Sequence, residues 1–232
     1  MKMRFLCLSM LICLIALGAC SSGAVMTQAT GFAYEVVVVM DQDQWKGEAG
    51  EAIKGDLTAS IVGLPQSEPT LKVTYVQPKD FNGLLRYVRN ILVINIDPAV
   101  YTKTSLAYEA DRWAQNQVVV TLRSPDAASI LAYLEEGHTL SDFFVKVEMR
   151  RAISQLKDGY STLVMDKLKD QFDVMLNAPS NFPYYKDTTD FFWSSNNANT
   201  GRMDLVVYSF PYTDPNTFTV DYLVAKRDSV MK

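Results

Sequence analysis

The strongest strand signal of the chain lies in seven residues, Tyr34-Glu35-Val36-Val37-Val38-Val39-Met40. Four successive valines in a short apolar run favour a buried strand, because β-branched side chains fit a pleated surface. Further along, Ile91–Ile96 is apolar on both faces and predicts a strand at the centre of a sheet. Val118–Leu122 predicts another strand. We interpret Leu71–Tyr75 as a strand because its residues alternate, and Leu106–Arg112 as a strand although its pattern also allows a helix.

Apolar residues at helical spacing follow the first strand, from Trp45 to Ile61. Three glycines, Gly47, Gly50 and Gly55, fall within this pattern. Each glycine costs a helix about 1 kcal/mol relative to alanine. We therefore interpret the three glycines as positions where another part of the backbone comes close.

A helical hairpin is predicted across residues 124–159. Ser124-Pro125-Asp126 is typical of a helix start, with a capping hydroxyl, a proline in the first turn and an acid near the positive end of the helix dipole. This helix is expected to end at Gly137. Thr139 with Asp142 then resembles a capping box in its acid variant and predicts the start of the second helix.

The last third of the chain predicts a helix, a second β region and a final helix. The residues concerned are Leu163–Phe172 (helix), Val174–Leu176, Asp190–Trp193 and Leu205–Phe210 (strands), Ser194–Gly201 (hairpin loop) and the residues from Phe218 onward (helix). The final helical pattern reaches Lys232 without a terminating glycine or proline, so we expect the natural protein to be longer.

Together these elements predict an α+β fold with mixed or mostly antiparallel sheets and a helical hairpin. We expect one domain over residues 34–232, or two subdomains, 34–123 and 160–232, joined by the hairpin. The order helix, strand, aromatic loop and apolar strand occurs twice, and each copy ends at an Asp-Pro pair, Asp97-Pro98 and Asp214-Pro215. This repetition leads to the hypothesis of two similar βαβ-type halves. The alternative is that the order is coincidental, because α+β domains also show it without a duplication.

The N-terminus has the layout of an export signal. Lys2 and Arg4 precede the apolar run Phe5–Leu17, which is too short for a membrane-spanning helix. The small pair Gly18-Ala19 directly before Cys20 resembles the lipobox of bacterial lipoproteins. That resemblance implies a signal peptide over residues 1–19, acylation of Cys20 and a lipidated tether over residues 20–33. The alternative is an ordinary secretory signal in which Cys20 is incidental.

Composition excludes several classes of function. The chain has 22 basic and 26 acidic residues, and loss of Lys2 and Arg4 would leave 20 against 26, a net charge of −6. A domain of this charge without a basic stripe is not expected to bind nucleic acid. The three cysteines, Cys7, Cys13 and Cys20, all lie at the front. The predicted domain therefore has no disulfide, no cysteine nucleophile and no thiolate metal site.

No catalytic pattern survives inspection. His138 is the only histidine, and its place in a turn between helices favours a structural role. Ser154-Gln155-Leu156-Lys157 matches the Ser-x-x-Lys pattern of penicillin-binding enzymes, but its serine falls late in a predicted helix instead of at a helix start. We predict no enzyme activity, no catalytic residue, no cofactor and no metal site.

One group of aromatic residues could bind a ligand: Phe182, Tyr184, Tyr185 and Trp193, together with Phe191 and Phe192. Exposed aromatic rings could stack on sugars, and this is the hypothesis of a glycan-binding module. The alternative, which we favour, is that these rings pack in a core and a hairpin.

Four runs of the chain carry a resemblance to a known family: Glu35-Val36-Val37-Val38-Val39-Met40-Asp41, Leu64-Pro65-Gln66-Ser67-Glu68-Pro69, Arg89-Asn90-Ile91-Leu92-Val93-Ile94 and Asp111-Arg112-Trp113-Ala114-Gln115-Asn116-Gln117. They resemble a family of Gram-negative envelope lipoproteins classed as domain of unknown function 4837. The resemblance extends from Tyr34 to the end of the chain. It implies an envelope location and a lipid anchor, and it supplies no catalytic residues.

The sequence thus predicts a lipid-anchored envelope protein that acts as a non-enzymatic binding or assembly module. Ser21 and Ser22 follow Cys20 without an acidic run, which favours the outer membrane with the domain facing the periplasm. The predicted partners are the membrane, through acylated Cys20, and an envelope protein or a glycan. The alternatives are a glycan-binding module that uses the aromatic group and a hydrolase in which His138 meets a serine and an acid.

Overall fold

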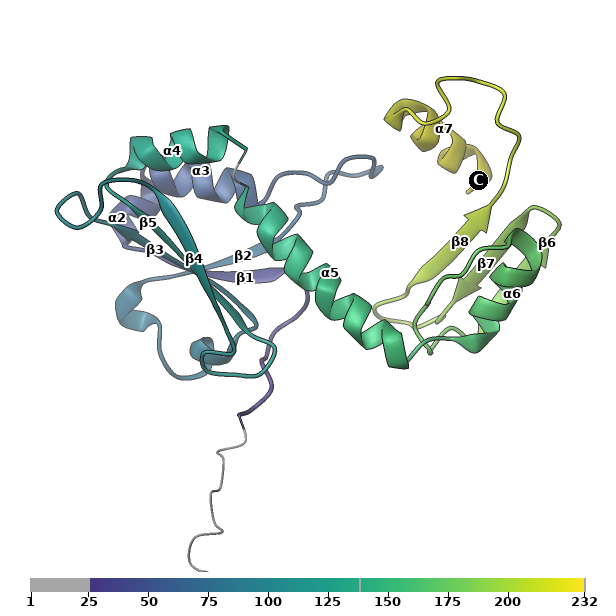
Figure 1. Cartoon of the computed structure of the whole chain (residues 1–232), viewed down its shortest axis with the longest axis horizontal. Helices are drawn as coiled ribbons and strands as arrows, with labels where there is room; N and C mark the ends of the chain where they lie inside the picture. The colour runs from purple at the N-terminus through teal and green to yellow at the C-terminus, as the bar shows by residue number, and fades with distance from the viewer. Residues whose placement is uncertain (1–25, 138, 232) are drawn as a thin grey trace, which may run out of the picture.

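The computed structural model describes residues 26–137 and 139–231. The predicted signal peptide, Cys20 and His138 lie outside the described residues. The fold is α+β, as predicted, and it contains a five-stranded mixed sheet and a three-stranded antiparallel sheet (Figure 1). We call these the first sheet and the second sheet.

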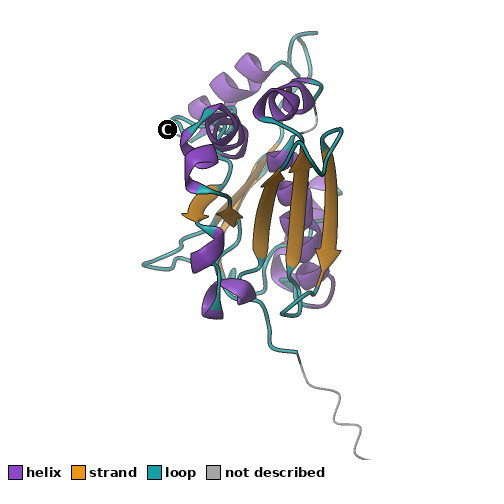
Figure 2. Ribbon diagram, turned by 90° about the vertical axis from the view of Figure 1, so that its left-hand side faces the viewer, coloured by secondary structure: helices purple, strands orange, loops and turns teal. Residues whose placement is uncertain are grey.

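The first sheet has the strand order β2-β1-β3-β5-β4. Neighbouring strands from β2 to β5 run parallel, and only β4 pairs antiparallel, with β5. Figure 2 shows strands of this sheet side by side. The strand bounds are β1 (Glu35–Val39), β2 (Lys72–Val76), β3 (Asn90–Ile96), β4 (Ser105–Ala110) and β5 (Val118–Ser124).

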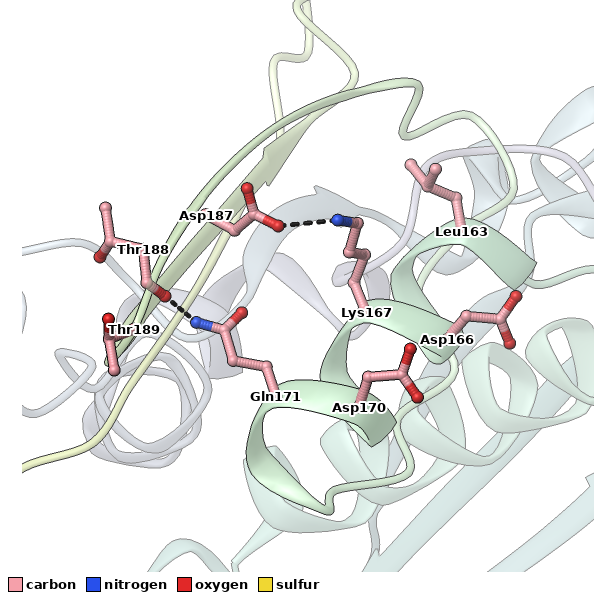
Figure 3. Close-up of a pocket in the computed structure, with 8 residues that line it drawn as sticks. All are labelled: Leu163, Asp166, Lys167, Asp170, Gln171, Asp187, Thr188 and Thr189. Carbon is pink, nitrogen blue, oxygen red and sulfur yellow. Dashed lines mark hydrogen bonds and ion pairs between the residues drawn. The ribbon is translucent and has the colours of Figure 1, made fainter.

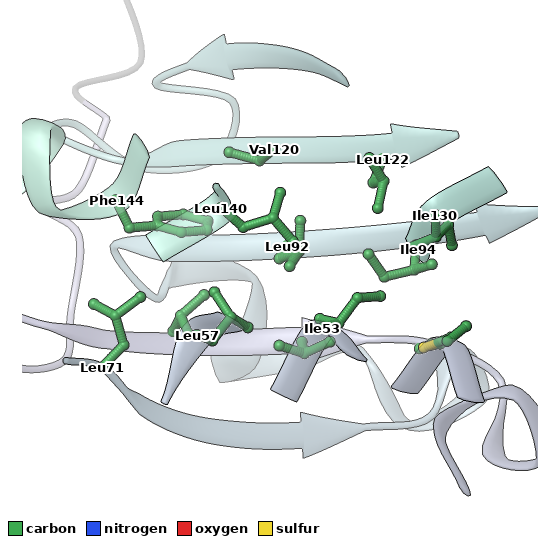
Figure 4. Packing of buried hydrophobic residues seen from close by; sticks show 14 of the residues in the cluster. Ile53, Leu57, Leu71, Leu92, Ile94, Val120, Leu122, Ile130, Leu140 and Phe144 are labelled. Atoms are coloured by element: carbon green, nitrogen blue, oxygen red, sulfur yellow. The ribbon is translucent and has the colours of Figure 1, made fainter. Parts of the chain in front are cut away.

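Helices and loops cover the two faces of the first sheet. One face packs against α3, α4 and the start of α5, and Figure 4 shows Ile53 and Leu57 of α3 near Leu92 and Ile94 of β3. On the other face, Val37, Val39, Ile91 and Val119 pack against loop residues that include Phe81 and Trp113. The bounds are α2 (Gln42–Lys46), α3 (Glu48–Leu57), the 3-10 turns η1 (Pro78–Asp80) and η2 (Gly83–Tyr87), α4 (Ala127–Glu135) and α5 (Leu140–Asp158).

The second sheet forms a separate core with α6. Val164 and Leu168 of α6 are buried against Phe192 of β7, together with Leu205 and Val207 of β8. The long helix α5 connects the two cores (Figure 1). The remaining bounds are α6 (Thr162–Phe172), β6 (Tyr184–Thr188), β7 (Phe191–Ser195), β8 (Asp204–Tyr208) and α7 (Val220–Val230).

The hypothesis of two similar βαβ-type halves does not fit the topology. β1 and β2 pair in parallel across α3, as a βαβ unit requires. β6, β7 and β8 instead form an antiparallel meander, joined by a tight turn at Thr189-Asp190 and by a longer loop between Ser195 and Asp204. No strand forms at Val174–Leu176 in the described chain. The backbone is irregular there, and the side chain of Met175 is exposed. Tyr184 and Tyr185 belong to β6, a strand that the local sequence pattern did not predict.

The two helices of the hairpin are capped at their N-termini by groups other than the predicted ones. At α4 the cap is Asp126, whose Oδ1 accepts from Ser129 N at 2.8 Å, while Ser124 ends β5. At α5, Thr139 is the N-cap residue but its side chain makes no capping bond. A carboxylate oxygen of Asp56, at the end of α3, accepts instead from the first backbone N–H groups of α5, at 2.9 and 3.0 Å. Asp56, a neighbour of the helix start in the tertiary structure, therefore provides the cap that the side chain of Thr139 does not.

Among the three glycines, only Gly50 shows the predicted close approach. A Cβ atom at Gly50 would lie 2.0 Å from the carbonyl oxygen of Trp45, which belongs to α2. At Gly47 the nearest atom would be an ordinary 3.4 Å away, and at Gly55 nothing lies within 4 Å. The tight turn from α2 into α3 therefore requires glycine at position 50.

Candidate functional site

The strand register of the second sheet divides its aromatic side chains between two faces. Tyr184 pairs with Ser195 and Lys186 pairs with Trp193, so Tyr184 and Trp193 lie on one face. Tyr185 and Phe192 lie on the opposite face, which α6 covers. We call the face away from α6 the outer face; it carries Tyr184, Lys186, Thr188, Phe191, Trp193, Ser195, Asp204, Val206 and Tyr208.

The outer face is only partly covered. Tyr184 is 53% exposed, and Trp193 is half-buried. The indole Nε1 of Trp193 donates to Asp204 Oδ1 at 3.0 Å, and Arg202 Nε donates to Asp204 Oδ2 at 3.0 Å. The bond from Arg202 lowers the pKa of Asp204 below its usual value, so this carboxylate stays charged and fixes the indole. These hydrogen bonds therefore fix the indole ring of Trp193 on the face that also carries Tyr184.

The four aromatic residues predicted to bind do not form one platform. Phe182 is buried in the core beneath α6. Tyr184 and Trp193 share the outer face, whereas Tyr185, 39% exposed, stacks toward Phe192 on the other side with ring centroids 6.3 Å apart. The structure thus brings Tyr184 and Trp193 together and separates them from the other two.

A polar cavity of about 470 Å³ lies between α6 and the β6–β7 hairpin (Figure 3). Lys167 Nζ lies 2.8 Å from Asp187 Oδ2 and 4.8 Å from the ring centre of Tyr185. The bond to Asp187 raises the pKa of Lys167. Asp166 and Asp170 of α6 also line this cavity, so it holds three carboxylates and one ammonium group. Such a surface accepts hydrogen bonds from hydroxyl groups and repels anions.

A buried charged cluster, unpredicted from the sequence, joins α5 to the amino end of β3. Glu148, only 2% exposed, accepts from Arg89 Nη2 and from Arg151 Nη1, each at 2.6 Å. Asn90 Nδ2 donates to Glu148 Oε1 at 2.7 Å, and Asn90 Oδ1 accepts from Arg151 Nη1 at 2.7 Å. We call these four residues the Arg-Glu-Arg cluster. The one sequence signal for it is a glutamate on the buried side of α5, four residues after Phe144.

In residues 26–137 and 139–231, no three side chains of the histidine, cysteine or carboxylate type gather as a metal-binding group. Over the same ranges, no helix combines the length and the apolar character that a membrane crossing requires.

Two family models match this chain, one over each core. A family model described as Domain of unknown function (DUF4837) matches residues 161–232, which confirms the predicted resemblance for the α6–α7 part. The four runs that carried the resemblance lie earlier in the chain, within residues matched by a different model. No curated protein and no solved structure matches the chain. The model described as Domain of unknown function (DUF8532) covers residues 29–157, more than half of the 232, and the chain belongs to that family.

Proposed function

We propose that this chain is a lipid-anchored envelope protein that acts as a non-enzymatic binding or assembly module. Acylated Cys20 would hold it in the outer membrane, with the folded part facing the periplasm. The order of Lys2, Arg4, the apolar run and Gly18-Ala19-Cys20 supports the anchor. Stable anchoring takes more than one acyl chain, which a lipoprotein cysteine supplies.

The observation that carries the binding role is the outer face of the second sheet. An antiparallel sheet can leave one face to water, but that face is then usually polar. Here the outer face places Tyr184, Phe191, Trp193 and Tyr208 together, while α6 buries the opposite side. Aromatic residues with a polar handle are enriched where proteins bind partners. The outer face therefore suits a partner protein of the envelope.

The test has two parts, one for the anchor and one for the face. Metabolic labelling with a fatty-acid analogue should mark the wild-type chain and leave Cys20→Ala unmarked. Crosslinking of the lipidated full-length protein in envelope extracts should capture a partner that Tyr184→Ala and Trp193→Ala lose. The control is Phe32→Ala, which removes a ring 76% exposed elsewhere and should retain the partner. Equal capture by all variants would contradict a role for the outer face.

A second candidate is glycan binding at the cavity of Figure 3. Its three carboxylates offer hydrogen-bond acceptors for sugar hydroxyls (Figure 3), and the ring centre of Tyr185 lies 4.8 Å from Nζ of Lys167, which lines the cavity. Sedimentation with purified peptidoglycan tests this idea. Tyr185→Ala and Asp187→Asn should release the protein from the pellet, whereas Tyr184→Ala, on the opposite face, should not. Retention that none of these substitutions changes would remove this candidate.

The hydrolase alternative depends on His138, which lies outside the described residues. Turnover of peptidoglycan or another glycan that a single substitution such as His138→Ala abolishes would overturn the non-enzymatic proposal.

A further inference from the structure

A cavity of about 380 Å³ lies beside the Arg-Glu-Arg cluster, under the segment that leads back toward Cys20. Gln28 forms one wall, and Arg151, Ser154 and Gln155 of α5 form another. The N-terminal segment is fixed here, because Ala29 N donates to Gln115 O at 2.9 Å and Thr30 N donates to Tyr87 O at 2.8 Å. Arg89 and Asn116 complete the lining.

Among the described residues, the charged side chains that line this cavity are all positive, and they are Arg89 and Arg151. Glu148 forms ion pairs with both arginines, so the two cations and one carboxylate leave a net charge of +1. The side chains of Arg89 and Arg151 are only 21% and 13% exposed, so water screens this excess charge poorly. Arg150 and Asp111 line an adjoining hollow, where the carboxylate of Asp111 also acts on Arg151; counting these two residues as well, three cations and two carboxylates still leave a net charge of +1. A bound anion would neutralise the excess.

Each of the two arginines keeps an N–H group that no described residue accepts. Arg89 donates to Glu148 through Nη2, while its Nε is buried and has no hydrogen-bond partner within the described chain. A buried donor without a partner is costly and rare in folded proteins. Arg151 uses Nη1 and Nη2 for Asn90, Glu148 and the carbonyl oxygen of Arg89, and its Nε–H has no hydrogen-bond partner among the described residues. The hydroxyl of Ser154 and the amide of Gln155 line the same space.

We propose that this cavity binds a phosphate group. Guanidinium groups match phosphate oxygens in geometry and stay charged at every physiological pH. A tetrahedral phosphate offers enough oxygens for two arginines, a hydroxyl and an amide at once. The phosphate can be free in solution or belong to a lipid headgroup. From Cys20 to Gln28 an extended chain spans at most about 29 Å, so an acylated Cys20 would keep the cavity close to the membrane. The headgroup source rests on the anchor proposed above, whereas the phosphate chemistry does not.

Thermal unfolding of the full-length protein in neutral detergent tests the proposal. The midpoint should rise with the logarithm of inorganic phosphate concentration, relative to chloride at the same ionic strength. A second arm replaces inorganic phosphate by phosphatidylglycerol in the micelles. Gln155→Glu places a carboxylate four residues after Arg151 on the same helix, where it would act as a built-in anion. This variant should unfold at a higher temperature without phosphate, and its apparent phosphate affinity should fall by at least about tenfold.

The matched control is Ile153→Glu, which adds the same charge to α5 at a residue 55% exposed that does not line the cavity. It should keep the wild-type phosphate response. A wild-type response to either arm supports the proposal, and a response to phosphatidylglycerol alone identifies a lipid headgroup. No wild-type response in either arm would overturn it, and so would a Gln155→Glu response equal to wild type. A chain that responds to inorganic phosphate but takes up no fatty-acid label would contradict the anchor and leave the phosphate site standing.

Discussion

Asn90 and Glu148 are hydrogen-bonded at 2.7 Å although 58 positions separate them in the sequence. Asn90 begins β3 and is fully buried, and it also donates to the carbonyl oxygen of Glu35 in the neighbouring strand at 2.8 Å. Glu148 lies in the middle of α5. This contact therefore ties the helix that connects the two cores to the central strands of the first sheet.

Loss of the charge on Glu148 should destabilise the first core strongly. Glu148→Gln leaves Arg89 and Arg151 partly buried without a counter-charge, and breaking a buried pair in this way costs about 3–5 kcal/mol. Urea denaturation followed by amide signals of β3 and β5 measures the free energy of unfolding. Glu109→Gln is the control, because Glu109 is 64% exposed and its pair with Arg112 spans 3.6 Å. Its effect should stay below about 1 kcal/mol, and a similar loss in both variants would contradict the role of the cluster.

Replacing two glycines of α3 by alanine should change the free energy of unfolding in opposite directions. Gly50→Ala would push a Cβ atom to 2.0 Å from the backbone of Trp45, so it should cost at least about 1–3 kcal/mol, as overpacking does. Gly55→Ala meets no atom within 4 Å and lies inside a helix, so it should stabilise by about 0.5–1 kcal/mol. Chemical denaturation of both variants checks the pair. Destabilisation by Gly55→Ala would show that position 55 needs glycine for another reason.

Asp56 should make stability fall as pH rises through the acid range. Burial raises the pKa of Asp56 above its usual 3.8, and the bonds from Ser141 and Leu140 only partly offset this. The unfolded chain releases this proton near 3.8, while the folded chain keeps it to a higher pH. The stability from the raised pKa is thus complete below 3.8 and is lost as pH passes the folded value. Asp56→Asn cannot titrate, so its stability relative to wild type should improve across that window, measured by urea denaturation.

Asp126 serves as the control, because its pKa is shifted in the opposite direction to that of Asp56. The bond from Ser129 lowers the pKa of Asp126, so its stabilising effect is present above 3.8 and disappears as pH falls through the folded value. Asp126→Asn should therefore lose stability relative to wild type at the higher pH only. If both substitutions gave the same pH dependence, the assigned directions would be wrong.

The second core should unfold without the first. Phe192 is fully buried beneath α6, and Phe192→Ala should cost about 3–5 kcal/mol in that core. Hydrogen exchange should then accelerate for the amides of β6, β7 and β8, while β3 keeps wild-type protection. Tyr212→Ala is a surface control, since that ring is 64% exposed. Equal acceleration in both sheets would show that the two cores unfold as one unit.

Local pattern predicted much of the fold correctly. The valine run of β1 and the apolar runs of β3 and β5 are strands, because β-branched residues in short runs can be buried on both faces. The helical spacing in α5 and α6 likewise gave helices at the expected places. β6 was missed because Tyr184, Tyr185 and Lys186 are all exposed, so this edge strand has no buried face to impose an alternating pattern.

The sequence by itself determined the α+β class, the position of most helices and strands, and the absence of cysteine after Cys20, because each depends on residue identity or on spacing along one element. Only the tertiary structure decided that Asp56 caps α5, that Tyr184 and Trp193 share a face apart from Tyr185, and that Arg89 and Arg151 meet at Glu148. These contacts join residues from different elements. Their free energy depends on burial and on strand register, neither of which a local pattern specifies.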